Sequence, residues 1–147
     1  MLRVITNSVQ ETEAFAEKFG RTLKGGMVVA FFGGLGMGKT AFTRGLVRAR
    51  GIDAEVSSPT FALVHEYGGN PPVCHFDMYR VKSWEDLYAT GFFDYIDAGA
   101  ILAVEWSENI ENALPEDSVR IEIERGETEN QRIITVKGDE NYENFSL

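Results

Sequence analysis

Residues 27–40 read MVVAFFGGLGMGKT, and this stretch decides the fold. Residues 27–32 are continuously apolar and lie between glycines, which is typical of a strand buried on both faces of a parallel sheet. The next eight residues, 33–40, satisfy the pattern G-x-x-x-x-G-K-[ST]. Apolar residues then recur at helical spacing from about Lys39 to Arg50. The sequence therefore predicts a buried strand, a glycine-rich loop and a helix in direct succession.

This succession is the context of a phosphate-binding loop (P-loop). Glycines let the backbone curl so that its N–H groups point at phosphates, and the helix that follows adds its positive N-terminal end. We expect Lys39 to reach the β- and γ-phosphates of a nucleotide and the Thr40 hydroxyl to bind Mg²⁺. A glycine-rich turn without a ligand is the weaker alternative, because all four fixed residues of the motif are present. The predicted nucleotide-binding residues here are Gly33, Gly34, Leu35, Gly36, Met37, Gly38, Lys39, Thr40 and Ala41.

A magnesium ion in such a site needs a carboxylate in addition to the threonine hydroxyl. Glu105 follows the apolar run AILAV and has the general shape of a Walker B acid, whereas Asp77 follows VCHF, in which His75 interrupts the apolar run. We favour Glu105, and we expect both carboxylates to serve one site, one of them through water. The alternative for each is an acid at a strand end that faces solvent.

The remaining pattern predicts an α/β protein with the P-loop NTPase fold: a mostly parallel central sheet flanked by helices, with an antiparallel C-terminal edge. One domain over residues 1–147 is expected from the chain length and from the lack of a linker. Ser8 with Glu11, and Ser83 with Asp86, have the spacing of helix N-caps; the first of these helices is expected to run to Gly25. The other predicted strands are residues 2–6, 61–67, 73–76, 100–104, 119–123 and 132–136, the last two forming a hairpin.

Charge and composition exclude some classes of function. The 147 residues include 14 Lys+Arg and 23 Asp+Glu, a net charge of −9, which argues against a broad nucleic-acid-binding face. Arg44, Arg48 and Arg50 are the densest basic stretch, and they form either a local anion-binding edge or basic residues near a helix C-terminus.

The single cysteine, Cys74, cannot form an internal disulfide, and there is no Cys/His cluster with zinc spacing, which indicates a reducing compartment. Polar residues stand where a signal peptide needs its apolar region, and no apolar run approaches the roughly 18 residues of a membrane span. We therefore expect a cytoplasmic protein without a membrane partner.

Weaker sequence signals indicate which nucleotide base the site recognises. The chain lacks the N-K-x-D element with which GTPases recognise guanine, so ATP is favoured over GTP. Asn7, Ser8 and Thr12 are weak candidates for adenine contacts, and helix capping explains Ser8 equally well.

Several side chains carry two interpretations. Arg80 either stabilises charge in phosphoryl transfer or pairs structurally with Asp77 or Glu85. His75 is expected to be a sheet residue rather than a catalyst, and Trp84 to lie in a capped helix away from any motif. Most of six aromatic side chains are expected to be core: Tyr67, Tyr79, Trp84, Phe92, Phe93 and Tyr95.

Five segments together resemble one family. In order and near spacing, the chain is similar to the bacterial TsaE family of P-loop ATPases over GGLGMGKTAFTRGL (33–46), SSPTFALVHEY (57–67), HFDMYR (75–80), the region of Gly91 and VEWSE (104–108). Members of that family are required for the threonylcarbamoyl modification of the tRNA adenosine beside the anticodon. Two positions depart from the family pattern: Gly34 stands where an acid is common, and Met37 where alanine is common.

The resemblance implies roles for single residues. Thr40 and Glu105 correspond to magnesium ligands, and residues 57–60, which end in Thr60, correspond to a nucleotide-sensing switch. A motif important for ATPase activity supplies Asp77, Tyr79 and Arg80; Trp106 is placed beside the nucleotide, and Glu108 at a further position of the nucleotide site.

The resemblance also implies partners. Family members act with the transferase subunit TsaD and its companion TsaB, so tRNA is reached indirectly through that complex. The implied cofactors are ATP and Mg²⁺. Two other functions remain open from the motif alone: a small-molecule kinase, and a nucleotide-dependent binding module with negligible turnover.

Overall fold

The computed structural model describes residues 1–33, 38–56 and 64–138. Its strands are β1 (Leu2–Thr6), β2 (Val28–Phe32), β3 (Val64–Gly69), β4 (Pro72–Asp77), β5 (Ile101–Glu105), β6 (Val119–Arg125) and β7 (Arg132–Lys137). Its helices are α1 (Val9–Gly20), α2 (Lys39–Ala49), α3 (Trp84–Ala89), α4 (Phe92–Asp97) and the 3₁₀ helix η1 (Ser107–Ala113).

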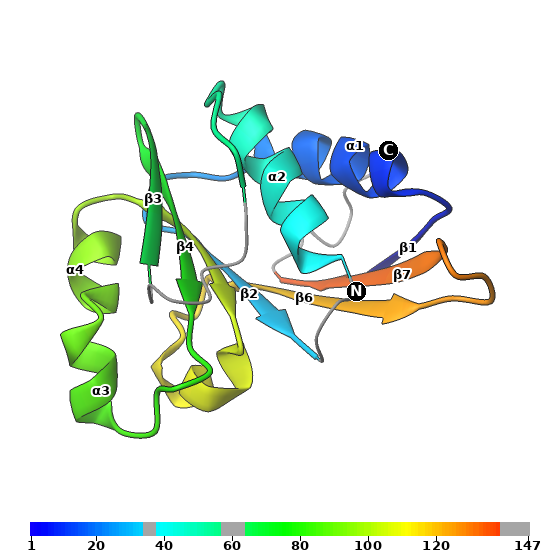
Figure 1. The fold of residues 1–147 in the computed structure, drawn as a ribbon. Coiled ribbons are helices and arrows are strands. Elements are labelled where there is room, and N and C mark those ends of the chain that lie inside the picture. Colours follow the sequence, from blue (N-terminus) through cyan, green and yellow to red (C-terminus); the bar gives the residue numbers. More distant parts are fainter. Residues whose placement is uncertain (34–37, 57–63, 139–147) are drawn as a thin grey trace.

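The strands form one mixed sheet in the order β1-β7-β6-β2-β5-β4-β3 (Figure 1). The central strands β6, β2, β5 and β4 run parallel, with Val29 beside Val119 on one side and Ala103 on the other. The predicted α/β class and its antiparallel C-terminal hairpin are confirmed. The structure adds two features: β3 makes the other edge antiparallel too, and β1 lies outside the hairpin, paired with β7.

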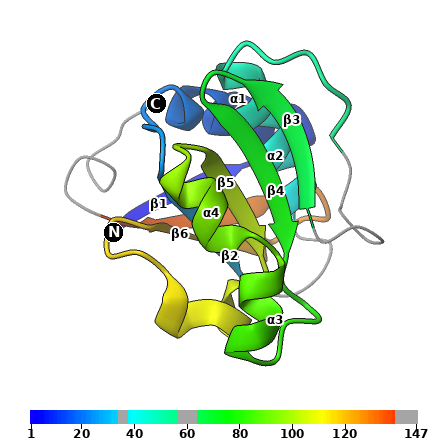
Figure 2. The ribbon, with the colours of Figure 1, turned by 90° about the vertical axis from the view of Figure 1, so that its left-hand side faces the viewer.

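Two apolar layers enclose the sheet. Helices α1 and α2 cover one face of the sheet and contribute Phe15, Phe42 and Leu46 to the core there. Helices α3, α4 and η1 cover the other face, where Phe76 of β4 and Phe92 of α4 are buried (Figures 1 and 2). Burying both faces explains why β2 is apolar along its length and β5 is apolar up to Glu105, its last residue.

Helix α1 is shorter than predicted. It starts at its Ser8 cap, where the hydroxyl accepts a hydrogen bond from the Glu11 N–H, but it ends at Gly20 instead of continuing to Gly25. Leu23 is buried at 4% exposure although it follows the helix, so its apolar character reflects core packing of the turn.

The basic stretch on α2 contacts α1. Arg44 forms a salt bridge and hydrogen bond with Glu13, and Arg48 lies 3.9 Å from carboxylate oxygens of both Glu13 and Glu17. Arg50 donates to the Leu23 carbonyl at 3.3 Å. Arg48 and Arg50 thus lie at the C-terminus of α2, as the second interpretation expected, and Arg44 and Arg48 also join α2 to α1, which neither interpretation included.

The expectation that most of the six aromatic residues are core is confirmed: Phe92 is fully buried, and Tyr67, Phe93 and Tyr95 are half-buried against the core. Tyr79 and Trp84 are the exceptions, at 59% and 55% exposure, and the neighbouring Tyr88 is 65% exposed. In the part of the chain that the structure describes, no helix is long and apolar enough to span a membrane.

Candidate functional site

The ends of three parallel strands assemble the site. β2 ends immediately before Gly33, and its residue Ala30 lies beside Val104 of β5. Asp77 and Glu105 are the last residues of β4 and β5 and lie opposite each other in register. Because these strands are parallel and adjacent, the start of the glycine-rich loop and both predicted carboxylates lie at one edge of the sheet.

Lys39 is the buried cation of this edge. Gly38 precedes it with φ 101°, a left-handed conformation that glycine adopts without strain, and α2 starts at Lys39. The Lys39 side chain is 4% exposed, and its Nζ donates to the Gly33 carbonyl at 2.7 Å. The same Nζ lies 5.6 Å from the centroid of the Trp106 ring, within cation–π range. Thr40 is half-buried and Ala41 is buried, both in the first turn of α2.

Glu105 has a partner that the sequence did not indicate. Its side chain is buried at 8% exposure, and His75 lies beside it with Nε2 2.7 Å from Oε2. A carboxylate only accepts hydrogen bonds, so His75 Nε2 carries the hydrogen. Buried Nδ1 of the same ring has no hydrogen-bond partner among the described residues. His75 is thus the sheet residue that was expected, and it also fixes the orientation of the proposed metal ligand.

Asp77 is more accessible than Glu105. It is half-buried, and its Oδ1 accepts the Tyr79 N–H at 2.9 Å, which closes the turn after β4. Arg80 in this turn is exposed and, within the described residues, forms no ion pair with Asp77 or Glu85. The structural pairing proposed for Arg80 is therefore absent there.

Trp106 and Glu108 link η1 to the site. Trp106 adopts φ 59°, and its ring packs on Tyr79 with centroids 4.9 Å apart. The Gly33 N–H donates to Glu108 Oε2 at 3.3 Å. Both predicted residues thus touch the start of the glycine-rich loop or its lysine.

The donor set fits a magnesium ion. Thr40, Asp77 and Glu105 offer a hydroxyl and carboxylates, the hard oxygen ligands that Mg²⁺ prefers. No group of three or more His, Cys, Asp or Glu side chains able to hold a metal occurs among the described residues. Mg²⁺ sites usually combine one or two carboxylates with water and phosphate oxygens, and Asp77 and Glu105 are two carboxylates at neighbouring strand ends.

The weak adenine candidates have structural partners. Ser8 caps α1, Thr12 shares a buried hydrogen bond with Thr6, and Asn7 Oδ1 accepts from Gln131 Nε2 at 3.1 Å. The residues Gly34, Leu35, Gly36, Met37, Ser57, Ser58, Pro59 and Thr60 lie outside the described residues, so the predictions made for them stay predictions.

Cys74, beside His75 on β4, is not a nucleophile of this site. Burial, together with the Glu66 carboxylate, raises the pKa of the Cys74 thiol from 9.0 to about 11. The thiol is therefore neutral at physiological pH and behaves as a small apolar core residue.

Residues 6–134 match the family model described as "Threonylcarbamoyl adenosine biosynthesis protein TsaE". The chain belongs to the TsaE family. It is 36% identical over 135 residues to the tRNA threonylcarbamoyladenosine biosynthesis protein TsaE of Treponema pallidum, covering 92% of this chain and 99% of that protein. The TsaE protein of Bacillus subtilis is 37% identical over 137 residues, covering 91% and 85% of the two chains.

A solved structure supports the same family. The crystal structure of Bacillus subtilis YdiB superimposes with a TM-score of 0.79 and 32% identity, covering 97% of this chain and 88% of that one. The P-loop architecture and the TsaE resemblance predicted from the sequence are thereby confirmed.

Two residues beside the site of this TsaE family member were missed. His75 was set aside as a sheet residue, because only the strand register shows that its ring reaches Glu105. Arg132, at the start of β7, approaches the end of the glycine-rich loop: a Cβ placed on Gly38 would lie 4.0 Å from the Arg132 Cγ. Gly38 and Arg132 are 94 positions apart in the sequence, so no local sequence signal indicates this proximity.

Proposed function

We propose that this chain is a Mg²⁺-dependent ATPase that serves the threonylcarbamoyl modification of tRNA, together with TsaD-like and TsaB-like partners. The observation that carries the proposal is the position of Lys39. Its buried ammonium lies at the N-terminus of α2, next to Gly33 and Trp106 and at the sheet edge that carries Glu105 and Asp77. A buried cation at a helix N-terminus favours binding of a polyanionic ligand such as a nucleoside triphosphate.

The side chains divide the work of phosphoryl transfer. Lys39 would exchange its contact with the Gly33 carbonyl for phosphate oxygens, and Thr40 with Glu105 and Asp77 would hold Mg²⁺. The metal, when bound, supplies charge that offsets the negative charge of the transferring phosphoryl group. Arg80, exposed and unpaired among the described residues, is available to add positive charge from the turn after β4.

Charge supports indirect contact with tRNA. The chain carries −9, and Arg44 and Arg48 of its basic stretch are already bound to acidic residues of α1. Little positive charge therefore remains there to neutralise tRNA phosphates. The partner proteins, in the cytoplasm, then make the contact with tRNA. ATP hydrolysis resets the complex of the chain with its partners. Because hydrolysis serves that complex, we expect the chain alone to hydrolyse ATP slowly.

The test measures phosphate release by the purified chain with Mg²⁺ and ATP, with and without the TsaD–TsaB pair. We expect slow release alone and strong stimulation by the pair. Lys39→Ala should weaken ATP binding and abolish release, whereas the control Lys18→Ala, an exposed lysine on α1, should leave both unchanged. ATP affinity and hydrolysis equal to the parent protein in Lys39→Ala would overturn the assignment.

Two added conditions separate the other functions. Phosphate transfer to a compound from a cell's small-molecule extract would favour a kinase. Tight ATP binding without release under any condition would favour a binding module. Thr60→Ala tests the switch segment: we expect ATP binding to persist and the stimulation by partners to be lost.

A further inference from the structure

Three aromatic side chains on α3 and α4, two of them exposed and the third half-buried, form a cluster that is here called the aromatic surface. It consists of Trp84, Tyr88 and Phe93, of which Trp84 and Tyr88 are 55% and 65% exposed. Trp84 and Phe93 stack with centroids 6.5 Å apart, and Tyr88 lies 5.1 Å from Phe93. Exposed aromatic clusters of this kind are unusual on a surface that only meets water and are typical of protein interfaces.

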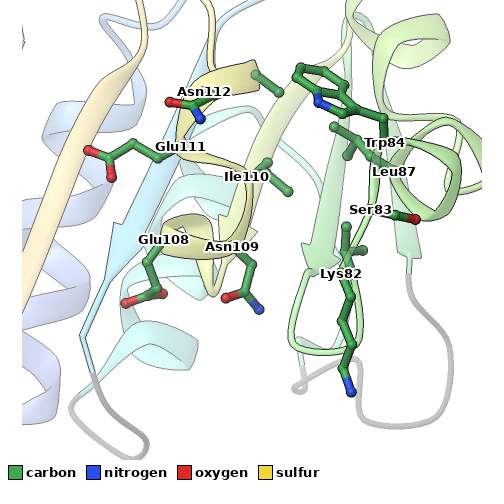
Figure 3. Close-up of a pocket in the computed structure, with 11 residues that line it drawn as sticks. Lys82, Ser83, Trp84, Leu87, Glu108, Asn109, Ile110, Glu111 and Asn112 are labelled. Atoms are coloured by element: carbon green, nitrogen blue, oxygen red, sulfur yellow. The ribbon is translucent and has the colours of Figure 1, made fainter.

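A hollow of about 270 Å³ adjoins the aromatic surface, between α3 and η1. Figure 3 shows Trp84 and Leu87 on its α3 side and Glu108, Asn109 and Ile110 on its η1 side. Leu87 and Ile110 lie buried at the base of the hollow, and polar side chains make up most of its lining, so a large side chain that entered it would lie on an apolar base within a polar rim. Its size suits a single large side chain of a partner.

The charge of this part of the molecule restricts what can bind there. Helices α3 and α4 carry Glu85, Asp86, Asp94 and Asp97 and no Lys or Arg, and the charged residues that line the hollow are Lys82, Glu108 and Glu111. Glu85 and Asp94 are exposed on the helices that bear the aromatic surface. Nucleic acid, an anionic membrane and a second copy of this chain would all meet repulsion, whereas a basic protein segment would be attracted.

We propose that the aromatic surface binds a basic segment of a partner protein, with one of that segment's apolar side chains seated in the hollow. This proposal adds a contact surface to the proposed function. The choice of the TsaD–TsaB pair as the tested partner rests on that proposed function. The location also gives such a partner a route to the nucleotide site. Helix η1 lines the hollow while its Glu108 accepts the Gly33 N–H and its Asn109 donates to the Met78 carbonyl at 2.9 Å.

The test measures binding of the purified TsaD–TsaB pair to the full chain, without any measurement of hydrolysis. We expect Trp84→Ala combined with Tyr88→Ala to weaken binding at least roughly tenfold, as loss of aromatic interface anchors does. The matched control combines Ile5→Ala with Val9→Ala, two apolar side chains that are 56% and 52% exposed away from α3 and α4; it should bind like the parent protein.

Charge reversal tests the basic character of the partner. Glu85→Lys should weaken binding by roughly threefold at low ionic strength and less at about 0.5 M salt, because added salt screens the attraction. Glu124→Lys, an exposed position on β6, is the control for the same change of net charge. A Glu85→Lys protein that binds as tightly as the Glu124→Lys protein would overturn the basic character assigned to the partner.

The outcomes separate this inference from the proposed function. Unchanged affinity of the Trp84/Tyr88 double variant would overturn the aromatic surface and leave the proposed partnership standing. No binding by the parent protein would overturn both. Self-association of the parent that the double variant abolishes, with normal binding of the pair, would assign the surface to a second copy. Loss of ATPase activity alone would not affect the inference.

Discussion

Replacing Glu105 by glutamine and by alanine separates its structural role from its chemical one. Alanine leaves the fully buried His75 Nε2–H without the acceptor that now lies 2.7 Å away. An unsatisfied buried donor costs about 1–3 kcal/mol, and Glu105→Ala should lose that much stability. Glutamine keeps a carbonyl oxygen for His75 but loses the charge, so we expect about 1 kcal/mol at most, the difference between a charged and a neutral acceptor.

The two variants should behave alike in the metal assay. Both lack the carboxylate that Mg²⁺ would use, so each should need more Mg²⁺ and release phosphate more slowly. Urea unfolding measures the first effect: with an m-value near 2 kcal/mol/M, a loss of about 2 kcal/mol in Glu105→Ala lowers the midpoint by about 1 M. A Mg²⁺ titration of phosphate release measures the second.

Either half of this reasoning can fail independently. A Glu105→Ala midpoint equal to that of the parent protein would show that the bond to His75 contributes nothing to stability. A normal Mg²⁺ titration for Glu105→Gln would remove Glu105 from the metal site in favour of Asp77. Asp77→Asn is the matched comparison, because Asp77 is half-buried and ends the neighbouring strand.

Three further predictions concern other parts of the chain. Adding Mg²⁺ and ATP should change the intrinsic tryptophan fluorescence. Trp106→Phe should abolish that change and Trp84→Phe should leave it, because Trp106 lies against Lys39. The reverse pattern would place the nucleotide elsewhere. Unfolding free energy should fall as the pH rises from 9.0 to about 11, since the unfolded Cys74 thiol ionises first, and Cys74→Ala should flatten this dependence. Gly45→Ala should cost about 1–3 kcal/mol in urea unfolding, because its Cβ would lie 2.5 Å from the Glu13 carbonyl oxygen; unchanged stability would contradict that close packing.

Much of the fold could be predicted from short stretches of sequence. The glycine-rich loop, its flanking strand and helix, and the N-caps at Ser8 and Ser83 all depend on residues within one or two turns of each other. Apolar alternation likewise located the hairpin of β6 and β7. Such signals are local because backbone dihedral preferences, capping hydrogen bonds and the 2.0 or 3.6 residue periods act between near neighbours.

The sequence by itself determined the P-loop fold class and predicted a site of Lys39, Thr40, Asp77 and Glu105. Only the tertiary structure decided which side chains meet across the sheet: that His75 holds Glu105, that α1 neutralises Arg44, and that Trp84 stays exposed beside η1. Strand order, register and helix docking fix these contacts. Strand order, register and helix docking depend on the apolar surface that the whole chain buries on folding, and no single segment of the sequence specifies that total.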